Sequence, residues 1–202
     1  MTELEKMTAG KVYDTSDREL VKLRAEAHKL CAKYSATLET DDKKRAKILK
    51  KLLPNAAEGA YLQGPVYFDY GVNIKVGKNF YANFNLTILD CCTVEIGDDV
   101  LIGPNASILT PVHPYRWQQR NMRKKPDGTV FDYEYAKPIK IGNNCWLAGN
   151  VTVIGGVTIG DGCVIGAGSV VTRDIPPDSL AVGNPCRVIR KITEKDNLDG
   201  ID

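Results

Sequence analysis

The feature that most constrains this chain is a six-residue repeat in its C-terminal half. Read in sixes from Ile141, the sequence runs IGNNCW LAGNVT VIGGVT IGDGCV IGAGSV VTRDIP. Each hexad begins with Ile, Leu or Val, and its second residue is usually Gly, Ala or Thr. An earlier block, IGDDVL IGPNAS ILTPVH, keeps this form, and a fainter one, VGKNFY ANFNLT, precedes it. A repeat of this kind fixes the architecture, so it takes precedence over local propensities.

A period of six predicts a solenoid of parallel strands. Side chains of a strand alternate between its two faces, so the same positions of every hexad can point inward. The small second residue permits a tight corner, three hexads make one triangular coil, and stacked coils bury a continuous column of aliphatic side chains. The block 141–176 supplies two coils and the block 96–113 supplies one. The sequence therefore predicts a mainly β fold, a parallel β-helix.

The two strong blocks do not join in phase. Ile108 and Ile141 are 33 positions apart, which is not a multiple of six. A segment, PYRWQQRNMRKKPDGTVFDYEYAK, is therefore expected to leave the coil at about residues 114–137. Long excursions from a compact solenoid usually serve function. His113, one of two histidines in the chain, lies at the root of this excursion.

The N-terminal region has a helical period instead. SDRELVKLRAEAHKLCAKY starts with Ser16 and has Glu19 three positions later, a capping-box pattern. Its apolar residues recur at spacings of three and four, which indicates one buried helix face. A second helix, TDDKKRAKILKKLL, would end before Pro54. We interpret its basic run, Lys43 to Lys51, as a solvated face.

These patterns divide the chain into three parts. We expect a helical cap at residues 1–58, a β-helix with its excursion at 59–192, and a C-terminal tail at 193–202. The N-terminal stretch lacks the apolar core of a signal peptide, and no run of 18 apolar residues occurs, so we expect a cytoplasmic location.

Net charge and cysteine spacing argue against a nucleic-acid-binding protein and against a disulfide-bonded one. Lys and Arg number 27 against 25 Asp and Glu, a net charge of +2 that is too small to favour nucleic-acid binding. The six cysteines form no C-x-x-C pair and are expected to be buried, reduced thiols.

Four stretches together resemble the maltose and galactoside O-acetyltransferases, a family of hexapeptide-repeat acyltransferases. They are YFDYGVNIKVGKNFYANFNLTILD, ILTPVHP, IGNNCWLAGNVTV and IGAGSVVTRDIPPDSLAVGNPCRVIR. The leader beginning TAGKVYD is similar to the maltose acetyltransferase cap of that family, and the resemblance spans roughly residues 5–192. It implies a left-handed β-helix that assembles as a homotrimer. It also implies transfer of an acetyl group from acetyl-coenzyme A to a hydroxyl of a mono- or disaccharide, in clefts between subunits.

The resemblance also implies which residues form the acceptor side. His113 matches the general base of the family, and an imidazole suits this role because it titrates near neutrality. No nucleophile elbow is present, so direct transfer is expected. The matching acceptor-binding residues are Asp14, Asp69, Tyr81, Asn83, Asp90 and Glu134. Two points stay open: Glu134 either orients His113 or binds sugar, and Asp90 is followed by Cys91 where galactoside relatives often have a second acid.

The donor side maps onto the C-terminal coils. Arginine guanidinium groups suit the coenzyme A phosphates because they form bidentate, charge-assisted hydrogen bonds. The matching residues are Trp146, Gly149, Ala167, Thr172, Arg173, Arg187 and Arg190.

Rival functions come from other classes. A three-histidine zinc site, as in solenoid carbonic anhydrases, does not fit a chain with two histidines, and no metal is expected. Serine acetyltransferases carry a much longer helical domain than this leader. An acetyltransferase for an antibiotic and a non-catalytic binding solenoid stay as alternatives, although the second would not need a histidine at the root of a long loop.

Overall fold

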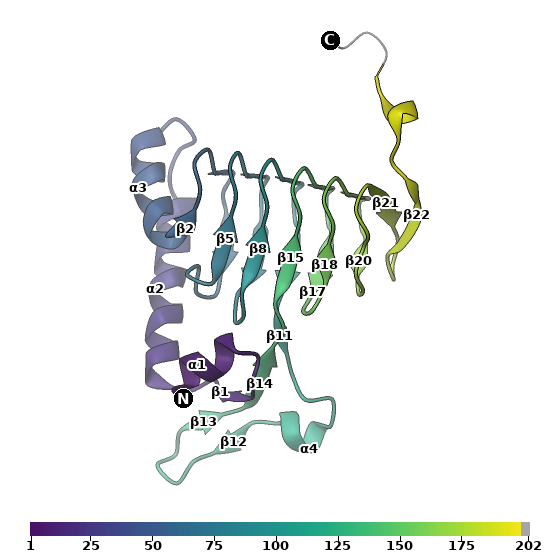
Figure 1. Ribbon diagram of the computed structural model, residues 1–202. Helices are drawn as coiled ribbons and strands as arrows, with labels where there is room; N and C mark the ends of the chain where they lie inside the picture. Colours follow the sequence, from purple (N-terminus) through teal and green to yellow (C-terminus); the bar gives the residue numbers. More distant parts are fainter. Residues whose placement is uncertain (199–202) are drawn as a thin grey trace.

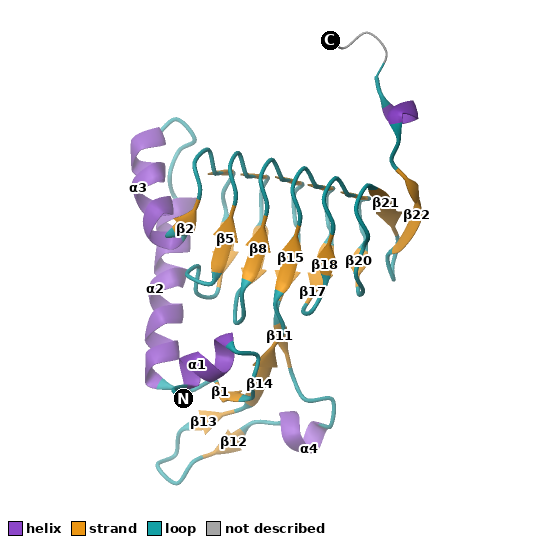
Figure 2. Cartoon of the chain, in the orientation of Figure 1, coloured by secondary structure: helices purple, strands orange, loops and turns teal. Residues whose placement is uncertain are grey.

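The computed structural model, which describes residues 1–198, confirms the predicted left-handed parallel β-helix with an N-terminal helical cap (Figure 1). The last four positions of the predicted C-terminal tail, 199–202, lie outside the described residues. Strands recur from coil to coil and lie across the long axis of the solenoid, whereas the α-helices gather at its N-terminal end and in the excursion (Figure 2).

The solenoid has three sheets, which we number in the order in which the chain reaches them. The first sheet holds β2 (Asn55–Ala56), β5 (Ile74–Val76), β8 (Val94–Ile96), β15 (Ile139–Ile141) and β18 (Thr158–Ile159). The second sheet holds β3 (Tyr61–Leu62), β6 (Tyr81–Ala82), β9 (Leu101–Ile102), β16 (Trp146–Leu147), β19 (Val164–Ile165), β21 (Ser179–Val182) and β22 (Arg187–Lys191). The third sheet holds β4 (Val66–Phe68), β7 (Leu86–Leu89), β10 (Ser107–Leu109), β17 (Thr152–Ile154) and β20 (Val170–Val171).

The aliphatic residue that opens each hexad forms the core, as predicted. These side chains stack in register from coil to coil and are at most 3% exposed. They are Ile96, Ile102, Ile108, Ile141, Leu147, Val153, Ile159, Ile165 and Val171.

The second residue of the hexad is small for a steric reason. A Cβ on Gly142 would lie 2.2 Å from Oδ1 and 2.6 Å from the backbone nitrogen of Asp161 in the next coil. Gly97 meets Asn143 at 2.5 Å in the same way. The tight corners themselves are made by Asn and Asp residues at positive φ, such as Asn144 at 55°, because these side chains tolerate the left-handed conformation.

Two coil lengths explain why the N-terminal repeat is faint. Val76 pairs with Ile96, 20 positions later, whereas Ile141 pairs with Ile159, 18 positions later. The two extra residues lie at the corner between the third and first sheets. There Ile88 and Ile96 are eight positions apart, whereas the stacked Val153 and Ile159 are six apart. This corner therefore carries a longer loop in the early coils.

The helical cap consists of α1 (Glu3–Thr8), α2 (Arg18–Ser35) and α3 (Asp42–Leu52), and α2 packs against β4. The prediction that Ser16 caps α2 is wrong. Asp17 is the N-cap, and its carboxylate accepts from the amides of Glu19 and Leu20. Ser16 instead donates its hydroxyl to Asp14.

The basic run of α3 is not entirely solvated, which corrects a second expectation. Arg45 is 5% exposed, and its guanidinium donates to the hydroxyl of Tyr34 and the carbonyl of Leu62. It also lies over the ring of Tyr34, with 4.5 Å from Cζ to the centroid, so it joins the helix to the first coil.

The excursion leaves the third sheet after β10 and returns to the first sheet at β15. It contains β11 (Pro111–Val112), α4 (Trp117–Arg120), β12 (Arg123–Lys124), β13 (Val130–Phe131) and β14 (Tyr133–Ala136). The amide of Lys137 donates to the carbonyl of Thr110 and closes its root. Strand β1 (Tyr13–Asp14) of the cap pairs with β14, which also pairs with β11. This three-stranded sheet β1-β14-β11 brings the N-terminal leader beside the excursion (Figure 1).

The C-terminal end closes with the antiparallel hairpin of β21 and β22, followed by the short 3₁₀ helix η1 (Glu194–Asp196). All six cysteines are buried and unpaired, as predicted. Within residues 1–198, no helix has the length and apolar character needed to cross a membrane.

Candidate active site

His113 stands between two carboxylates. Its Nδ1 lies 3.4 Å from Oδ2 of Asp132, and its Nε2 lies 3.3 Å from Oε2 of Glu134. The imidazole is 45% exposed, whereas the two carboxylates are 17% and 12% exposed. The ring is thus accessible from one side and held by charged partners on the others.

The sheet β1-β14-β11 positions this group. Asp132 directly precedes β14 and Glu134 lies within it, and both carboxylates reach the same imidazole. Tyr13 and Thr15 of the leader secure them: the Tyr13 hydroxyl donates to Glu134, and the Thr15 hydroxyl donates to Oδ1 of Asp132 at 2.5 Å. His113 follows β11 and meets both carboxylates from the other edge of β14.

The neighbouring corner of the solenoid lies next to Glu134. Burial raises the pKa of this carboxyl, while hydrogen bonds from Tyr13 and Cys91 and the nearby His113 lower it. Burial also raises the pKa of the Cys91 thiol. This thiol lies 3.6 Å from Oδ2 of Asp69, and Oδ1 of Asp69 lies 3.6 Å from Nε2 of His28. Predicted acceptor residues Asp69 and Glu134 therefore lie on either side of the Cys91 thiol.

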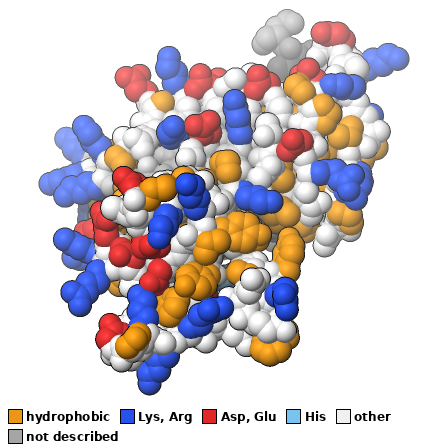
Figure 3. Space-filling view, turned by 60° about the horizontal axis from the view of Figure 1, so that its bottom comes forward, with side chains coloured by type: hydrophobic (Ala, Val, Ile, Leu, Met, Phe, Trp, Pro, Cys, Tyr) orange, Lys and Arg blue, Asp and Glu red, His pale blue; other side chains and the backbone are white. Residues whose placement is uncertain are grey.

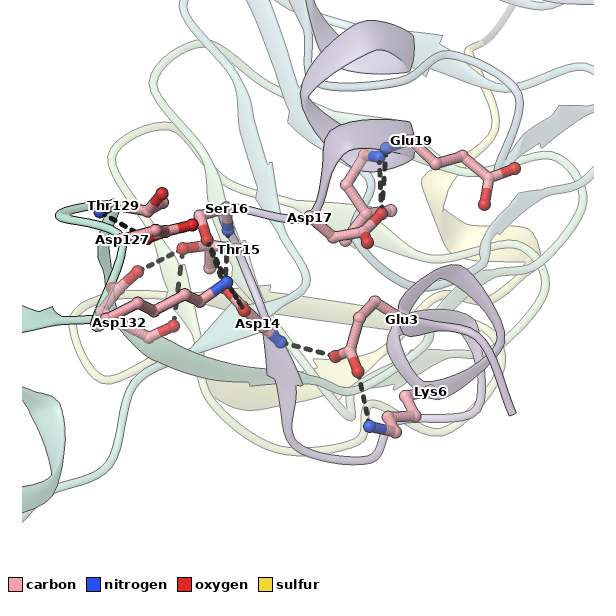
Figure 4. Close-up of polar contacts among 12 residues, drawn as sticks. Glu3, Lys6, Asp14, Thr15, Ser16, Asp17, Glu19, Asp127, Thr129 and Asp132 are labelled. Carbon is pink, nitrogen blue, oxygen red and sulfur yellow. Dashed lines mark hydrogen bonds and ion pairs between the residues drawn. The ribbon is translucent and has the colours of Figure 1, made fainter.

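Asp14 does not join this group. It pairs with Lys125 of the excursion, with 2.5 Å between Oδ2 and Nζ, and its Oδ1 accepts from the amide and hydroxyl of Ser16 (Figure 4). Successive strand residues point to opposite faces, so Asp14 faces away from the side on which Tyr13 meets Glu134. Partial burial raises the pKa of Asp14, but the hydrogen bonds from Lys125 and Ser16 outweigh it and lower the pKa.

Asp90 is closed off from any acceptor. Its side chain is fully buried, and its two oxygens accept from the amides of Tyr70, at 2.8 Å, and Asn73, at 3.3 Å. Burial raises its pKa to about 7, although these amide hydrogen bonds act in the opposite direction. Asp90 therefore holds the long corner loops of two coils, and in this chain its buried carboxylate presents no exposed oxygen to the expected acceptor.

A second group of predicted residues lies on the corner between the second and third sheets. A pocket of about 290 Å³ is lined by Tyr81, Asn83, Trp146 and Gly149, among others. It unites two residues predicted for the acceptor with two predicted for the donor. The Oδ1 atom of Asn83 accepts from the amide of Phe84 at 2.7 Å, and the ring of Trp146 is half-exposed.

The remaining donor-side residues lie closer to the C-terminus, Ala167 on the same corner and Thr172 and Arg173 on the corner between the third and first sheets. The turn that contains Ala167 stacks on the turn of Gly149, because the amide of Gly168 donates to the carbonyl of Gly149 at 2.9 Å. Thr172 and Arg173 are exposed just after β20.

The other two predicted arginines project from β22. Arg187 is exposed, and one of its Nη1 hydrogens goes to the carbonyl of Cys186. Arg190 is bound by Asp196, with nitrogen–oxygen distances of 2.8 and 2.6 Å, so an incoming phosphate would compete with this carboxylate.

The two groups lie on different corners of one prism. His113 stands off the corner between the third and first sheets, whereas Asn83 lies at the corner between the second and third. One copy of the chain therefore does not bring the imidazole to the pocket of Asn83 and Trp146.

Sequence reasoning missed Asp132 and Lys125. A usable signal exists for the first, because VFDYEYA alternates between acidic and aromatic residues and so places Asp132 and Glu134 on one strand face. No sequence signal ties Lys125 to Asp14, which are 111 positions apart and meet through the pairing of the leader with β14.

Comparisons with known proteins agree with this architecture. The maltose acetyltransferase hexapeptide capping motif matches residues 6–56, the bacterial transferase hexapeptide (six repeats) matches 138–173, and the hexapeptide repeat of succinyl-transferase matches 93–113. The galactoside O-acetyltransferase of Escherichia coli is 42% identical over 97% of this chain and 92% of its own length.

Two solved structures are similar along nearly the whole chain. A galactoside acetyltransferase in complex with coenzyme A has a TM-score of 0.88 at 42% identity, covering 97% of this chain and 94% of the other. A maltose O-acetyltransferase from Clostridium difficile has a TM-score of 0.83 at 47% identity, covering 96% and 99%.

Proposed function

Because the chain belongs to the maltose and galactoside O-acetyltransferase family of hexapeptide-repeat enzymes, we propose that it transfers an acetyl group from acetyl-coenzyme A to a sugar hydroxyl, with His113 as general base. Membership makes it an acetyl-coenzyme A-dependent acetyltransferase. The observation that carries the mechanism is the half-exposed imidazole held between two carboxylates.

The proposed reaction is a direct transfer. His113 takes the proton of the acceptor hydroxyl as its oxygen attacks the thioester carbonyl, and the thiolate of coenzyme A leaves from the tetrahedral intermediate. Asp69 and Glu134 have carboxylate oxygens that accept from sugar hydroxyls on the side of the solenoid corner. We leave Asp14 and Asp90 out of the acceptor site because the first is paired with Lys125 and the second is buried.

The donor is proposed to lie along the other corner. The exposed Trp146 ring offers an apolar surface to the pantetheine arm, and the turns of Gly149 and Ala167 leave space beside it. Farther toward the C-terminus, Thr172 and Arg173 on the corner after β20, and Arg187 and Arg190 on β22, offer a hydroxyl and three guanidinium groups to the nucleotide phosphates.

A second copy of the chain completes the proposed site, in a trimer. Apolar side chains exposed on the second sheet, Leu101 and Trp146 at 50%, are continuous with the pocket of Asn83. The excursion exposes Trp117 at 60% and Met122 at 63%, and apolar side chains gather on the face of the molecule that carries it (Figure 3). Closed rotational symmetry would cover such surfaces and bring one copy's His113 to the other copy's Asn83.

The reaction is tested by thiol release. Purified protein is incubated with acetyl-coenzyme A and a panel of glucosides, galactosides, maltose and chloramphenicol. Turnover with sugars and little with chloramphenicol is expected. Turnover confined to chloramphenicol would assign the enzyme to antibiotic acetylation instead.

His113 is tested by the variant His113→Ala. General-base catalysis is worth about 10²–10⁴-fold, so kcat should fall by this factor while acetyl-coenzyme A affinity and Tm stay the same. Gln118→Ala, an exposed position of the same excursion, serves as the control. A variant that keeps more than about a tenth of the wild-type kcat would show that proton removal occurs elsewhere.

The shared site is tested by mixing two inactive variants. His113→Ala supplies an intact Asn83, and Asn83→Ala supplies an intact His113. After unfolding and refolding together, random trimers should hold both intact residues at about a quarter of their interfaces, so up to about a quarter of the wild-type activity returns. Sedimentation equilibrium should give three times the chain mass of 22.2 kDa. A mixture that stays inactive would show that each copy contains its own site.

A further inference from the structure

We propose that Asp132 is the positioning residue of His113, holding the ring proton on Nδ1 so that Nε2 is the basic nitrogen. The proposal rests on the proposed function, because it assigns work within that site. The assignment comes from the contacts of the imidazole itself.

Only one nitrogen of a neutral imidazole carries a proton, so the two carboxylates beside His113 cannot play the same part. The carboxylate that accepts the ring N–H sets the tautomer, and the other faces the nitrogen with the free electron pair. The question is therefore which of Asp132 and Glu134 orients the ring and which one lies at the basic nitrogen.

The surroundings of Asp132 fit the orienting role. One oxygen lies 3.4 Å from Nδ1, and the other accepts the Thr15 hydroxyl at 2.5 Å, so the carboxylate is fixed from its far side by the leader. It lies on the side of the excursion and the leader, as Figure 4 shows for its contact with Thr15. A carboxylate held in this way has one oxygen left to accept from the ring.

The surroundings of Glu134 fit the acceptor side. Its Oε2 lies 3.3 Å from Nε2 and its Oε1 accepts the Tyr13 hydroxyl, but unlike Asp132 it also borders the Cys91 thiol and, beyond it, Asp69 at the solenoid corner. A hydroxyl that donates to Nε2 arrives next to this carboxylate, which can accept from an adjacent hydroxyl of the same sugar. Glu134 thus contacts the acceptor, and Asp132 acts through His113.

The arrangement accounts for the path of the proton from the acceptor hydroxyl to the leaving thiolate. Nε2 takes the hydroxyl proton during attack, and His113 becomes an imidazolium. Its Nδ1–H stays hydrogen-bonded to the Asp132 carboxylate, which stabilises the positive charge without accepting the proton. The imidazolium then gives the Nε2 proton to the leaving thiolate of coenzyme A, which returns His113 to its starting tautomer.

Histidine nitrogen NMR tests this directly, because the chain has two histidines and His113→Ala identifies which signals belong to residue 113. In its neutral form, wild-type His113 should carry the proton on Nδ1. In Asp132→Ala the proton should move toward Nε2, which an unrestrained imidazole ring prefers. Asp127→Asn is the matched control, since this exposed carboxylate in the same excursion accepts from Thr129 and does not contact His113.

Kinetics provide the second readout. Asp132→Ala should lower kcat by about 10²-fold or more, leave KM for acetyl-coenzyme A unchanged, and show no change in Tm beyond that of Asp127→Asn. Asp132→Glu, which keeps a carboxylate, should recover part of the lost kcat. Glu134→Gln should raise KM for the sugar and leave the His113 tautomer unchanged.

Three outcomes would overturn the proposal: an Asp132→Ala variant with the wild-type tautomer, one with the wild-type kcat, or a tautomer that changes in Glu134→Gln instead. These results are separable from a failure of the proposed function. If His113→Ala stays active, the general-base mechanism fails whatever the tautomer is. If His113→Ala is inactive and Asp132→Ala is fully active, only the role of Asp132 is refuted.

Discussion

The buried carboxyl of Asp90 should make the stability of this protein depend on pH. It is fully buried, and burial raises its pKa to about 7 from the ordinary 3.8. The unfolded chain releases the proton near pH 4, whereas the folded chain holds it until about pH 7. Between these values the folded state binds more protons, so stability falls as pH rises through this window.

The magnitude follows from the two pKa values. They differ by about 3, and each pKa unit corresponds to about 1.4 kcal/mol, so the total loss is about 4 kcal/mol, with roughly 2–3 kcal/mol of it between pH 5 and pH 8. Asp90→Asn removes the titration. It also perturbs the hydrogen bond from the Asn73 amide, but that cost does not change with pH.

Equilibrium urea unfolding at pH 5, 6, 7 and 8, at one protein concentration, measures the effect. The stability of Asp90→Asn relative to the wild type should rise by roughly 2–3 kcal/mol from pH 5 to pH 8. Asp161→Asn, which removes an exposed carboxylate that also accepts a backbone amide from the adjacent coil, should show no such trend. Parallel wild-type and Asp90→Asn profiles would refute the reasoning, because they would mean that Asp90 titrates alike in the folded and unfolded chain.

Two further predictions concern the solenoid and the donor side. Gly142→Ala should lower the free energy of unfolding by about 1–3 kcal/mol, because the added Cβ would lie 2.2 Å from Oδ1 of Asp161. Gly149→Ala should be tolerated, because its Cβ would lie 3.5 Å from Pro104. Urea unfolding of both variants tests this pair. Arg187→Ala should weaken acetyl-coenzyme A binding by roughly 1.5–3 kcal/mol in calorimetry, and less for dephospho-coenzyme A if the arginine holds the 3′-phosphate; unchanged affinity would exclude Arg187 from the donor site.

The hexad pattern predicted the solenoid because one structural requirement recurs at every coil. Ile141, Ile159 and their equivalents must fill the same column, so the sequence repeats wherever the coil has 18 residues. The early coils have 20 residues, and the repeat there loses its phase at the corner after Phe68 and Ile88. The hexad pattern is therefore weakest at the longer corner loops of the early coils, which carry Asp69 and Asp90.

The errors in the cap have a common cause. Ser16 and Asp17 are both good N-cap residues, and local preference does not choose between them. The choice follows from tertiary contacts, because Asp14 engages the Ser16 hydroxyl and leaves Asp17 to cap α2. Arg45 lies in a basic helix, but the carbonyl of Leu62 and the Tyr34 ring draw it inward. Neither partner is visible from a helical period.

The residues around His113 were predictable in part. His113 and Glu134 were found because each matches a family position, whereas Asp132 was missed although it shares a strand face with Glu134. Strand alternation places both acids on one side but does not say which strand lies opposite. That information comes from the pairing of β14 with β11 on one edge and β1 on the other. The residues of such a site can be identified only when the strand pairing is known.

The corner of the β-helix at which a residue lies limits which other residues it can meet at one sugar, and it does so more strictly than the residue type does. Asn83 follows the second sheet and His113 follows the third, and a triangular coil keeps these corners apart by the width of a whole face. No rotamer or loop shift within one copy closes that separation, because the third sheet itself lies between them. If Asn83 and His113 act on one sugar, the sugar must bind where one copy's second-to-third corner meets another copy's excursion. The need for assembly is then a consequence of the hexad phase, and an isolated subunit should be inactive even when fully folded.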